Sequence, residues 1–332
     1  MIPNQPSSPV CYADPEDFQP STDGALPILI VGAGAVGGYL GGRLQEAGAD
    51  VTFLVRDEQR RQRLNEHGLR IRSPLGDVHL QPRVITPERA AADYTCIVLA
   101  CKAYDLEAAI NTIVPFIGER SFLLPLLNGI DHLDSLDQRF GRGRVLGGLA
   151  HLAVEREREG EIRHLNDFHR LVFGSRYEAQ QNVSERLAAV LAQTSLECRH
   201  SPAIEQDLWN KFVFLATLAG ATCLFRGPIG MILQSAGGER FIQGLLEECI
   251  TVAETAGYRP PENTLVEYRN LLSDRTTAYT ASMLRDIEAG RRTEADHILG
   301  DMLARAERDG LAGDCLRLAY SHLQVYEKRR QS

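Results

Sequence analysis

The chain has 332 residues, of which 44% are hydrophobic and 24% are charged, and its formal net charge at pH 7 is −8. This length and composition are typical of a soluble globular protein with two domains. The acidic balance argues against nucleic acid or an anionic membrane as the main partner, so we expect a small-molecule ligand and neither of those two.

Residues 1–26 contain five prolines, four acidic residues and no lysine or arginine. Because this segment lacks the basic and apolar regions of a signal peptide, we expect a disordered leader. The seven cysteines form no CxxC pair, which favours a reducing, cytoplasmic location. The nine histidines lack the spacing of a zinc site, so no metal is expected, and His164 and His169 are assigned to the surface or to turns.

An apolar run at residues 27–32 leads directly into a glycine-rich motif and then into a helical stretch. In a dinucleotide-binding fold the first glycine permits the tight turn, the second lets the backbone approach a pyrophosphate, and the third lets the helix pack closely on the sheet. The pyrophosphate would lie at the positive end of that helix. A second strand at residues 50–55 completes a β-α-β unit. The predicted cofactor-binding residues are Gly32, Gly34, Ala35, Val36 and Gly37.

The residue after the second strand indicates which dinucleotide is bound. An acidic residue there would accept the ribose 2′-hydroxyl of NAD, whereas an arginine would bind the 2′-phosphate of NADP. Here the strand ends in Arg56, although Asp57 follows it directly. Arg60, Arg61 and Arg63 come within two helical turns and would add charge-assisted bonds, unless they form a solvated basic helix face. We therefore predict NADP(H).

Two further strand-like runs, at residues 95–101 and 121–127, follow helical or turn segments. Such alternation predicts a parallel sheet covered by helices on both faces. Residues 68–80 alternate apolar and polar side chains around a proline and glycines, which is typical of a short antiparallel hairpin. Residues 144–176 are also β-rich.

From about Pro202 onward, long helical periodicities are interrupted by glycines and prolines. The apolar run at residues 212–225 is shorter than the ~20 residues of a membrane span, so we predict a buried core helix. The fold class is therefore α/β, with an N-terminal Rossmann-type doubly wound sheet and a C-terminal all-helical domain. We place the NADP-binding domain at 27–202 and the substrate and catalytic domain at 203–332, with the substrate in the cleft between them.

Lys211 is the only charged residue in the stretch at 208–214, where nearly all its neighbours are apolar. Burial would lower the pKa of its ammonium from about 10.4 and make it a proton donor near neutral pH. The alternative is a lysine whose stem packs on the helix while its head stays in water. Both interpretations fit the pattern.

Three other polar residues stand where a site would form. Glu294 follows Thr293 in a predicted N-cap, where a first-turn carboxylate is stabilised by the helix dipole even without a function. Asn128 follows the fourth strand and would project into the cleft, although Asn-Gly is also a common turn. Lys102 ends the third strand, and we expect it near the adenosine side of the cofactor, where it would add charge for the 2′-phosphate.

These residues stand in motifs that occur together in one family. The motifs are Gly32-Ala33-Gly34-Ala35-Val36-Gly37, Leu99-Ala100-Cys101-Lys102-Ala103, Leu127-Asn128-Gly129, Leu208-Trp209-Asn210-Lys211, Ser282-Met283-Leu284-Arg285-Asp286-Ile287 and Arg292-Thr293-Glu294. Over about residues 27–325 the chain resembles the ketopantoate reductases (2-dehydropantoate 2-reductases), enzymes of pantothenate biosynthesis. The resemblance implies NADPH-dependent reduction of a 2-oxo acid to the 2-hydroxy acid, with Lys211 as general acid toward the keto oxygen. It also implies that Glu294 holds or relays to that lysine and contacts the cofactor, and that Asn128 and Ser282 contact cofactor or substrate.

The chain departs from the family pattern in the substrate pocket. Members that reduce ketopantoate generally carry asparagines four and eight residues after the lysine and three residues before the serine. Here those positions are Leu215, Ala219 and Tyr279. Without these amides, a site discriminates poorly for a substrate with a carboxylate and a distal hydroxyl. The candidate substrates are then 2-dehydropantoate and a more apolar 2-oxo acid, branched or aromatic.

Two alternatives remain beside this prediction. One is another dehydrogenase, of the 3-hydroxy acid or opine type, against which the spacing of Lys211, Ser282 and Glu294 argues. The other is an NADP(H) sensor that binds the dinucleotide without turnover and uses its helical half to contact a partner protein. Apolar helical faces of this kind are also typical of homodimers.

Overall fold

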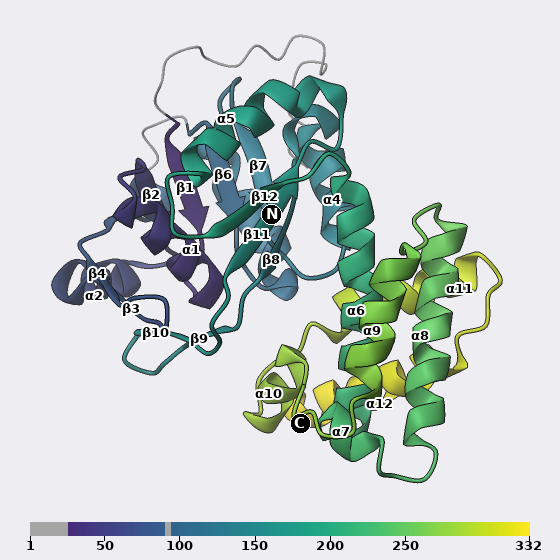
Figure 1. The fold of residues 1–332 in the computed structure, drawn as a ribbon. Coiled ribbons are helices and arrows are strands. Elements are labelled where there is room, and N and C mark those ends of the chain that lie inside the picture. Colours follow the sequence, from purple (N-terminus) through teal and green to yellow (C-terminus); the bar gives the residue numbers. More distant parts are fainter. Residues whose placement is uncertain (1–25, 90–93) are drawn as a thin grey trace, which may run out of the picture.

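The computed structural model describes residues 26–89 and 94–332, so the expectation of a disordered leader falls on residues that lie outside it, apart from Leu26 (Figure 1). A five-stranded parallel sheet in the order β5-β2-β1-β6-β7 forms the centre of the N-terminal half. Its strands are β1 (Ile28–Val31), β2 (Val51–Leu54), β5 (Arg83–Ile85), β6 (Cys96–Leu99) and β7 (Phe122–Pro125). All four residues are buried in β1, β2, β6 and β7, because both faces of the sheet are covered. The four predicted strands and the α/β class are confirmed.

Helix α1 (Ala35–Glu46) lies between the parallel sheet and a second sheet, and its glycines face both of them. A Cβ at Gly41 would overlap the Phe53 ring of β2, and a Cβ at Gly42 would overlap Ile71 of β3. Larger side chains on this helix would therefore push two sheets apart. The other helices of this half are α2 (Glu58–His67), α3 (Leu106–Ile113), α4 (Asp131–Phe140) and α5 (Gln181–Leu191).

The second sheet has the order β4-β3-β10-β9. Its strands are β3 (Leu69–Arg72), β4 (Val78–Leu80), β9 (Val154–Arg156) and β10 (Ile162–His164). The predicted hairpin is confirmed, since β3 and β4 pair antiparallel. A third sheet, in the order β12-β11-β8, is made of β8 (Gly147–His151), β11 (Arg170–Gly174) and β12 (Glu197–His200). It adjoins the first through a bridge between Val145 and Leu123 of β7.

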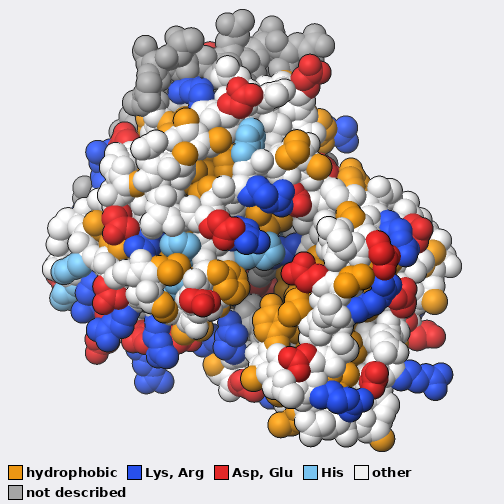
Figure 2. All heavy atoms as spheres, viewed as in Figure 1, with side chains coloured by type: hydrophobic (Ala, Val, Ile, Leu, Met, Phe, Trp, Pro, Cys, Tyr) orange, Lys and Arg blue, Asp and Glu red, His pale blue; other side chains and the backbone are white. Residues whose placement is uncertain are grey.

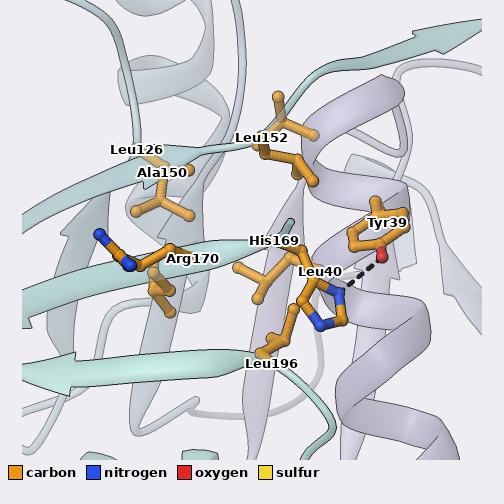
Figure 3. A pocket seen from close by; sticks show the side chains of 10 residues that line it. Tyr39, Leu40, Leu126, Ala150, Leu152, His169, Arg170 and Leu196 are labelled. Atoms are coloured by element: carbon orange, nitrogen blue, oxygen red, sulfur yellow. Dashed lines mark hydrogen bonds between the residues drawn. The ribbon is translucent and has the colours of Figure 1, made fainter. Parts of the chain in front are cut away.

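Both histidines that were expected at the surface or in turns are buried, and only His169 lies in a loop, between β10 and β11. His164 is 4% exposed and His169 is 7% exposed, because both rings pack against Tyr39 of α1. The Tyr39 hydroxyl lies 2.7 Å from His169 Nδ1 (Figure 3) and 3.2 Å from His164 Nδ1. The hollow in Figure 3 beside this cluster is lined mainly by apolar side chains and has room for about one water molecule, so it is too small for a dinucleotide.

The C-terminal half is helical from α6 onward (Figure 1). Its elements are α6 (Ile204–Phe225), α7 (Ile229–Ile232), α8 (Gly238–Thr255), α9 (Glu262–Ser273), α10 (Ser282–Glu288), the π-helical segment η7 (Asp296–Gly300), α11 (Asp301–Arg308) and α12 (Asp314–Gln331). Short 3-10 turns elsewhere are η2 (Pro87–Arg89), η3 (Ala103–Asp105), η4 (Val114–Phe116), η5 (Arg142–Arg144) and η6 (Glu178–Gln180).

Helix α6 is the axis of this half and also its link to the sheets. It packs on α8, α10 and α12, and its first turns contact β8 and β11, so a single apolar cluster continues from one half into the other. By length and composition α6 is apolar enough to cross a membrane, but 67% of its most apolar window is buried inside the structure. The prediction of a buried core helix is confirmed.

Candidate active site

The glycine-rich loop joins β1 to α1 in the geometry that a dinucleotide requires. Gly32 has φ +97°, a conformation that favours glycine. A Cβ at Gly37 would overlap the carbonyl oxygen of Gly32, so α1 can lie this close only with glycine there. A Cβ at Gly34 would meet no described atom within 4 Å, and no described side chain caps the first turn at Ala35 and Val36. The open position and the free amides fit a pyrophosphate at this helix end.

Of the four predicted arginines, one contacts this loop and another follows the second strand. Arg56 follows β2, and its 73% exposed side chain pairs with Asp105. Arg60, in the first turn of α2, donates from Nη2 to the carbonyl oxygen of Ala33 at 3.0 Å. Arg60 therefore links the second strand's end to the glycine-rich loop.

A further arginine, which the sequence pattern did not indicate, joins this group. Burial and the positive charges of Arg156 and Arg63 lower the pKa of Arg60 to about 10. Arg156 belongs to β9, nearly a hundred residues further along the chain, and no local motif surrounds it. Arg61 instead pairs with Glu58 within α2. The crowded guanidiniums create a position that an anion would stabilise.

Lys102, Glu294 and Asp286 bridge the two halves. Lys102 Nζ lies 3.0 Å from Glu294 Oε2 and 3.1 Å from Asp286 Oδ2, and the Ala103 amide donates to Glu294 Oε1 at 3.0 Å. Burial alone would lower the pKa of Lys102, but the two carboxylates outweigh it and raise that pKa.

The structure does not favour the expected place of Lys102 on the adenosine side, which stays a prediction. The strand order puts β6, which Lys102 follows, on the opposite side of β1 from β2 and its Arg56. Its ammonium is also held by two carboxylates of the helical half, so it is not a free charge for a 2′-phosphate.

Glu294 is buried, and it lies just before a helix rather than in the first turn. The predicted N-cap does not form, because the Thr293 hydroxyl donates to Glu327 Oε1 at 2.8 Å instead of capping the helix. In the described structure the hydrogen bonds of the Glu294 carboxylate go to Lys102 and the Ala103 amide, not to Lys211. Its negative charge still acts on Lys211, whose pKa it raises. Glu294 therefore influences the lysine through space and does not hold it.

Lys211 reaches from the helical half to the sheet half. Its Nζ donates to the carbonyl oxygen of Ala150 in β8 at 2.9 Å. Burial lowers the pKa of Lys211 to about 8, and the charge of Glu294 offsets part of that effect. Lys211 is half-buried and its ammonium is hydrogen-bonded to the protein, which favours the first interpretation over a lysine with a solvated head. At neutral pH the group is an ammonium that gives up its proton readily.

An aromatic and apolar surface continues from Lys211. Phe214 and Leu215 lie three and four residues after it, on the same face of α6, and both are half-buried. The ring of Tyr279 lies 6.1 Å from that of Phe214 at 28°, and the Tyr268 ring lies 4.7 Å from Phe214 on the same cluster. Figure 2 shows hydrophobic side chains gathered where the two halves meet. Phe214 was not predicted, although its spacing from Lys211 was the available signal.

The remaining predicted site residues differ in their access to this region. Asn128 is half-buried in the loop after β7, and Ser282 is exposed at the start of α10, one turn before Asp286 on the same face. Ala219 was wrongly predicted as a substrate contact, since it is 0% exposed. Eight residues on from Lys211, the helix has turned by about 80°, which directs Ala219 into the core of the helical half.

Comparisons with known proteins agree with this arrangement. Residues 28–177 match the family "Ketopantoate reductase PanE/ApbA", and residues 203–327 match "Ketopantoate reductase PanE/ApbA C terminal". The chain is 38% identical over 311 residues to "Uncharacterized oxidoreductase YkpB" of Bacillus subtilis (strain 168), which covers 92% of this chain and 100% of that protein.

Two solved structures are also similar. The 2-dehydropantoate 2-reductase of Geobacter metallireducens GS-15 has a TM-score of 0.82 at 28% identity, over 90% of this chain and 99% of that one. The ternary structure of D-mandelate dehydrogenase with NADH and anilino(oxo)acetate has a TM-score of 0.83 at 20% identity, over 92% and 100%, and shows a shared fold. The glycine-rich loop, the buried lysine and these matches lead to one conclusion: the chain belongs to the ketopantoate reductase family of nicotinamide-dependent oxidoreductases.

Proposed function

We propose that this protein reduces a 2-oxo acid with an apolar side chain to the 2-hydroxy acid, with NADPH as cofactor and Lys211 as general acid. The observation that carries the proposal is the Lys211 ammonium, which reaches from α6 to β8 at 2.9 Å and whose pKa burial lowers to about 8. A charged group kept at such a place costs stability, and proton donation accounts for it.

The residues of this chain supply binding, orientation and the proton. NADPH, when bound, supplies the hydride that C2 of the oxo acid receives. The Lys211 ammonium donates a hydrogen bond to the keto oxygen, stabilises the negative charge that develops there and transfers its proton to it. The oxygen becomes a hydroxyl, the lysine becomes a neutral amine, and solvent returns the proton.

The choice of NADPH over NADH is supported by the arginines at the ribose end. Arg60 contacts the glycine-rich loop, Arg56 follows the second strand, and Arg156 adds positive charge beside Arg60 from β9. A 2′-phosphate would relieve the repulsion among them, whereas the 2′-hydroxyl of NADH carries no charge to do so.

We expect Arg56→Ala to raise the KM for NADPH by roughly 10- to 100-fold, since one charge-assisted phosphate contact contributes about 1.5–3 kcal/mol. The KM for NADH should change little. Steady-state kinetics with both cofactors measure this, with Arg61→Ala as the control, because Arg61 pairs with Glu58 within α2. Equal effects of Arg56→Ala on both cofactors would contradict the 2′-phosphate assignment.

The substrate class is supported by the surface beside Lys211. Leu215, Phe214 and Tyr279 offer apolar and aromatic contacts where hydrogen-bonding amides would orient a polar substrate. A branched or aromatic side chain would bury apolar area against them, at roughly 25 cal/mol per Å².

The test is NADPH oxidation, followed at the nicotinamide absorbance, with 2-oxo acids from 2-dehydropantoate through branched-chain to aromatic. The proposal expects the highest kcat/KM for an apolar acid, at about 10⁴ M⁻¹s⁻¹ or more. A preference for 2-dehydropantoate would refute the apolar substrate class. NADPH binding without turnover of any acid would refute the reductase and favour a sensor.

Asparagines at the two divergent positions should shift this preference. We expect the double variant Leu215→Asn, Tyr279→Asn to raise the ratio of kcat/KM for 2-dehydropantoate to that for the best apolar acid at least tenfold. The reason is that amides gain polar contacts to the first substrate and lose apolar contacts to the second. The control is Leu271→Asn, an exposed leucine on α9. An unchanged ratio would show that these side chains do not line the substrate site.

A further inference from the structure

Two histidines meet across the boundary between the halves. His132, in the first turn of α4, is 0% exposed, and its Nδ1 lies 3.2 Å from Nε2 of His297 in η7. The two rings stack with centroids 5.4 Å apart at 30°. The other ring nitrogen of His297, Nδ1, lies 3.8 Å from Asp131 Oδ2. A hydrogen bond thus joins a sheet-half helix to a helical-half segment 165 residues away in sequence.

His297 also contacts the loop that carries Asn128. Gly129 has φ +80°, and a Cβ there would lie 2.9 Å from the carbonyl oxygen of His297 and 3.0 Å from its ring. The loop backbone therefore packs directly against His297. His132, three residues after Gly129 in the sequence, is hydrogen-bonded to the ring of His297. The Asn128–Gly129 turn therefore packs against η7, and α4, the helix that follows the turn, is hydrogen-bonded to the same residue of η7.

His132 is costly as a mere packing residue. Its Nε2 is buried and has no partner among the described residues, and a buried polar atom without a partner costs about 1–3 kcal/mol that an apolar side chain would avoid. Its partner His297 lies in a π-helical segment, and such segments are frequent at functional sites.

The charges around His132 keep it neutral. Burial lowers its pKa well below 6.5, and the neighbouring His297, Arg176 and Lys211 act in the same direction. The carboxylate of Asp131, the residue before His132, lies beside the other ring nitrogen of His297, Nδ1. A neutral imidazole can make the single hydrogen bond to His297 without adding a further positive charge near Arg176 and Lys211.

We propose that His132 and His297 form a positioning pair for the reduction: their contact fixes the Asn128–Gly129 loop of the sheet half against the helical half that carries Lys211. This inference rests on the proposed function, because it assigns the pair a role in aligning the two sides of that site. The pair contacts no reacting atom. A misalignment of about 1 Å between reacting groups can cost on the order of 100-fold in rate.

The test compares His132→Leu with His132→Asn, whose amide reproduces the Nδ1 position. We expect His132→Leu to lower kcat at least tenfold at pH 7.5, with KM for the oxo acid and Kd for NADPH changed less than threefold. His132→Asn should recover most of the lost kcat. His322→Leu, a half-buried histidine on α12, is the matched control and should retain kcat.

An unchanged kcat in folded His132→Leu would overturn the proposal, and so would equal losses in the Leu and Asn variants. A purely structural role would lower Tm without this split between kcat and KM. If His132→Leu does not fold, His297→Leu removes the same hydrogen bond from the other side, and His297→Gln, which reproduces the Nε2 position, is its rescue. A wild-type protein that turns over no 2-oxo acid would instead refute the proposed function, so the two failures are distinguishable.

Discussion

Lys211→Met is expected to lower kcat for 2-oxo acid reduction by about 10²- to 10⁴-fold, the range that general acids contribute. The methionine keeps most of the stem's packing but cannot donate a proton. Folding holds the ammonium where burial lowers its pKa to about 8, so below that pH its removal should leave the protein at least as stable. Steady-state kinetics and thermal unfolding measure the two expectations.

The same lysine sets the pH dependence. The proton donor is the ammonium, which is lost above a pKa of about 8, so wild-type kcat/KM should be level below this pH and fall about tenfold per pH unit well above it. Lys328→Met, at an exposed position in the last turn of α12, is the control and should leave rate and profile unchanged. Retained turnover in Lys211→Met, or an unaltered alkaline limb in it, would contradict the mechanism.

Two glycines of the glycine-rich motif, Gly34 and Gly37, are expected to differ in how substitution by alanine affects stability and NADPH binding. Gly37→Ala should lower the free energy of unfolding by about 3 kcal/mol, because its Cβ would overlap the carbonyl oxygen of Gly32 and the helix must shift. Gly34→Ala should change stability by less than about 1 kcal/mol, since its Cβ meets no described atom. Its Kd for NADPH should nevertheless rise at least tenfold, because the methyl group occupies the space through which a pyrophosphate approaches the backbone.

Urea unfolding and NADPH fluorescence titration separate these effects, and each variant is the other's control. A Gly34→Ala protein that binds NADPH as the wild type does would show that the dinucleotide lies elsewhere. A Gly37→Ala protein of unaltered stability would show that α1 can move away from the sheet at little cost.

The strand, turn and helix around Gly32 could be predicted from the sequence because every constraint there is local. Both faces of a buried parallel strand are covered, so its sequence is a continuous apolar run. The glycines at the turn are required by the backbone conformation there. The burial of Lys211 was one of two interpretations, since the apolar neighbours on α6 indicated a buried face but not which residue would cover the ammonium. The structure shows that the ammonium donates a hydrogen bond to the carbonyl oxygen of Ala150, which belongs to the other half of the chain.

The differences between prediction and structure share one cause, which is that remote segments decide what a polar side chain contacts. Lys102 was placed by its strand alone, but its partners Asp286 and Glu294 lie 184 and 192 residues away. Ala219 was placed by alignment with a motif, but the rotation of α6 turns it into the core. No local pattern predicts that Arg156 lies near Arg60, or that His132 contacts His297.

The fold class, the glycine-rich loop, the four central strands and the lysine on an apolar helix were predictable from the sequence, because periodicity and backbone conformation depend on neighbouring residues. The tertiary structure alone decided the bridge of Lys102, the arginine from β9, the aromatic surface beside Lys211 and the histidine pair. Those contacts depend on how two halves pack, and packing is a property of surfaces assembled from distant segments, each of which carries too little pattern to reveal its partner.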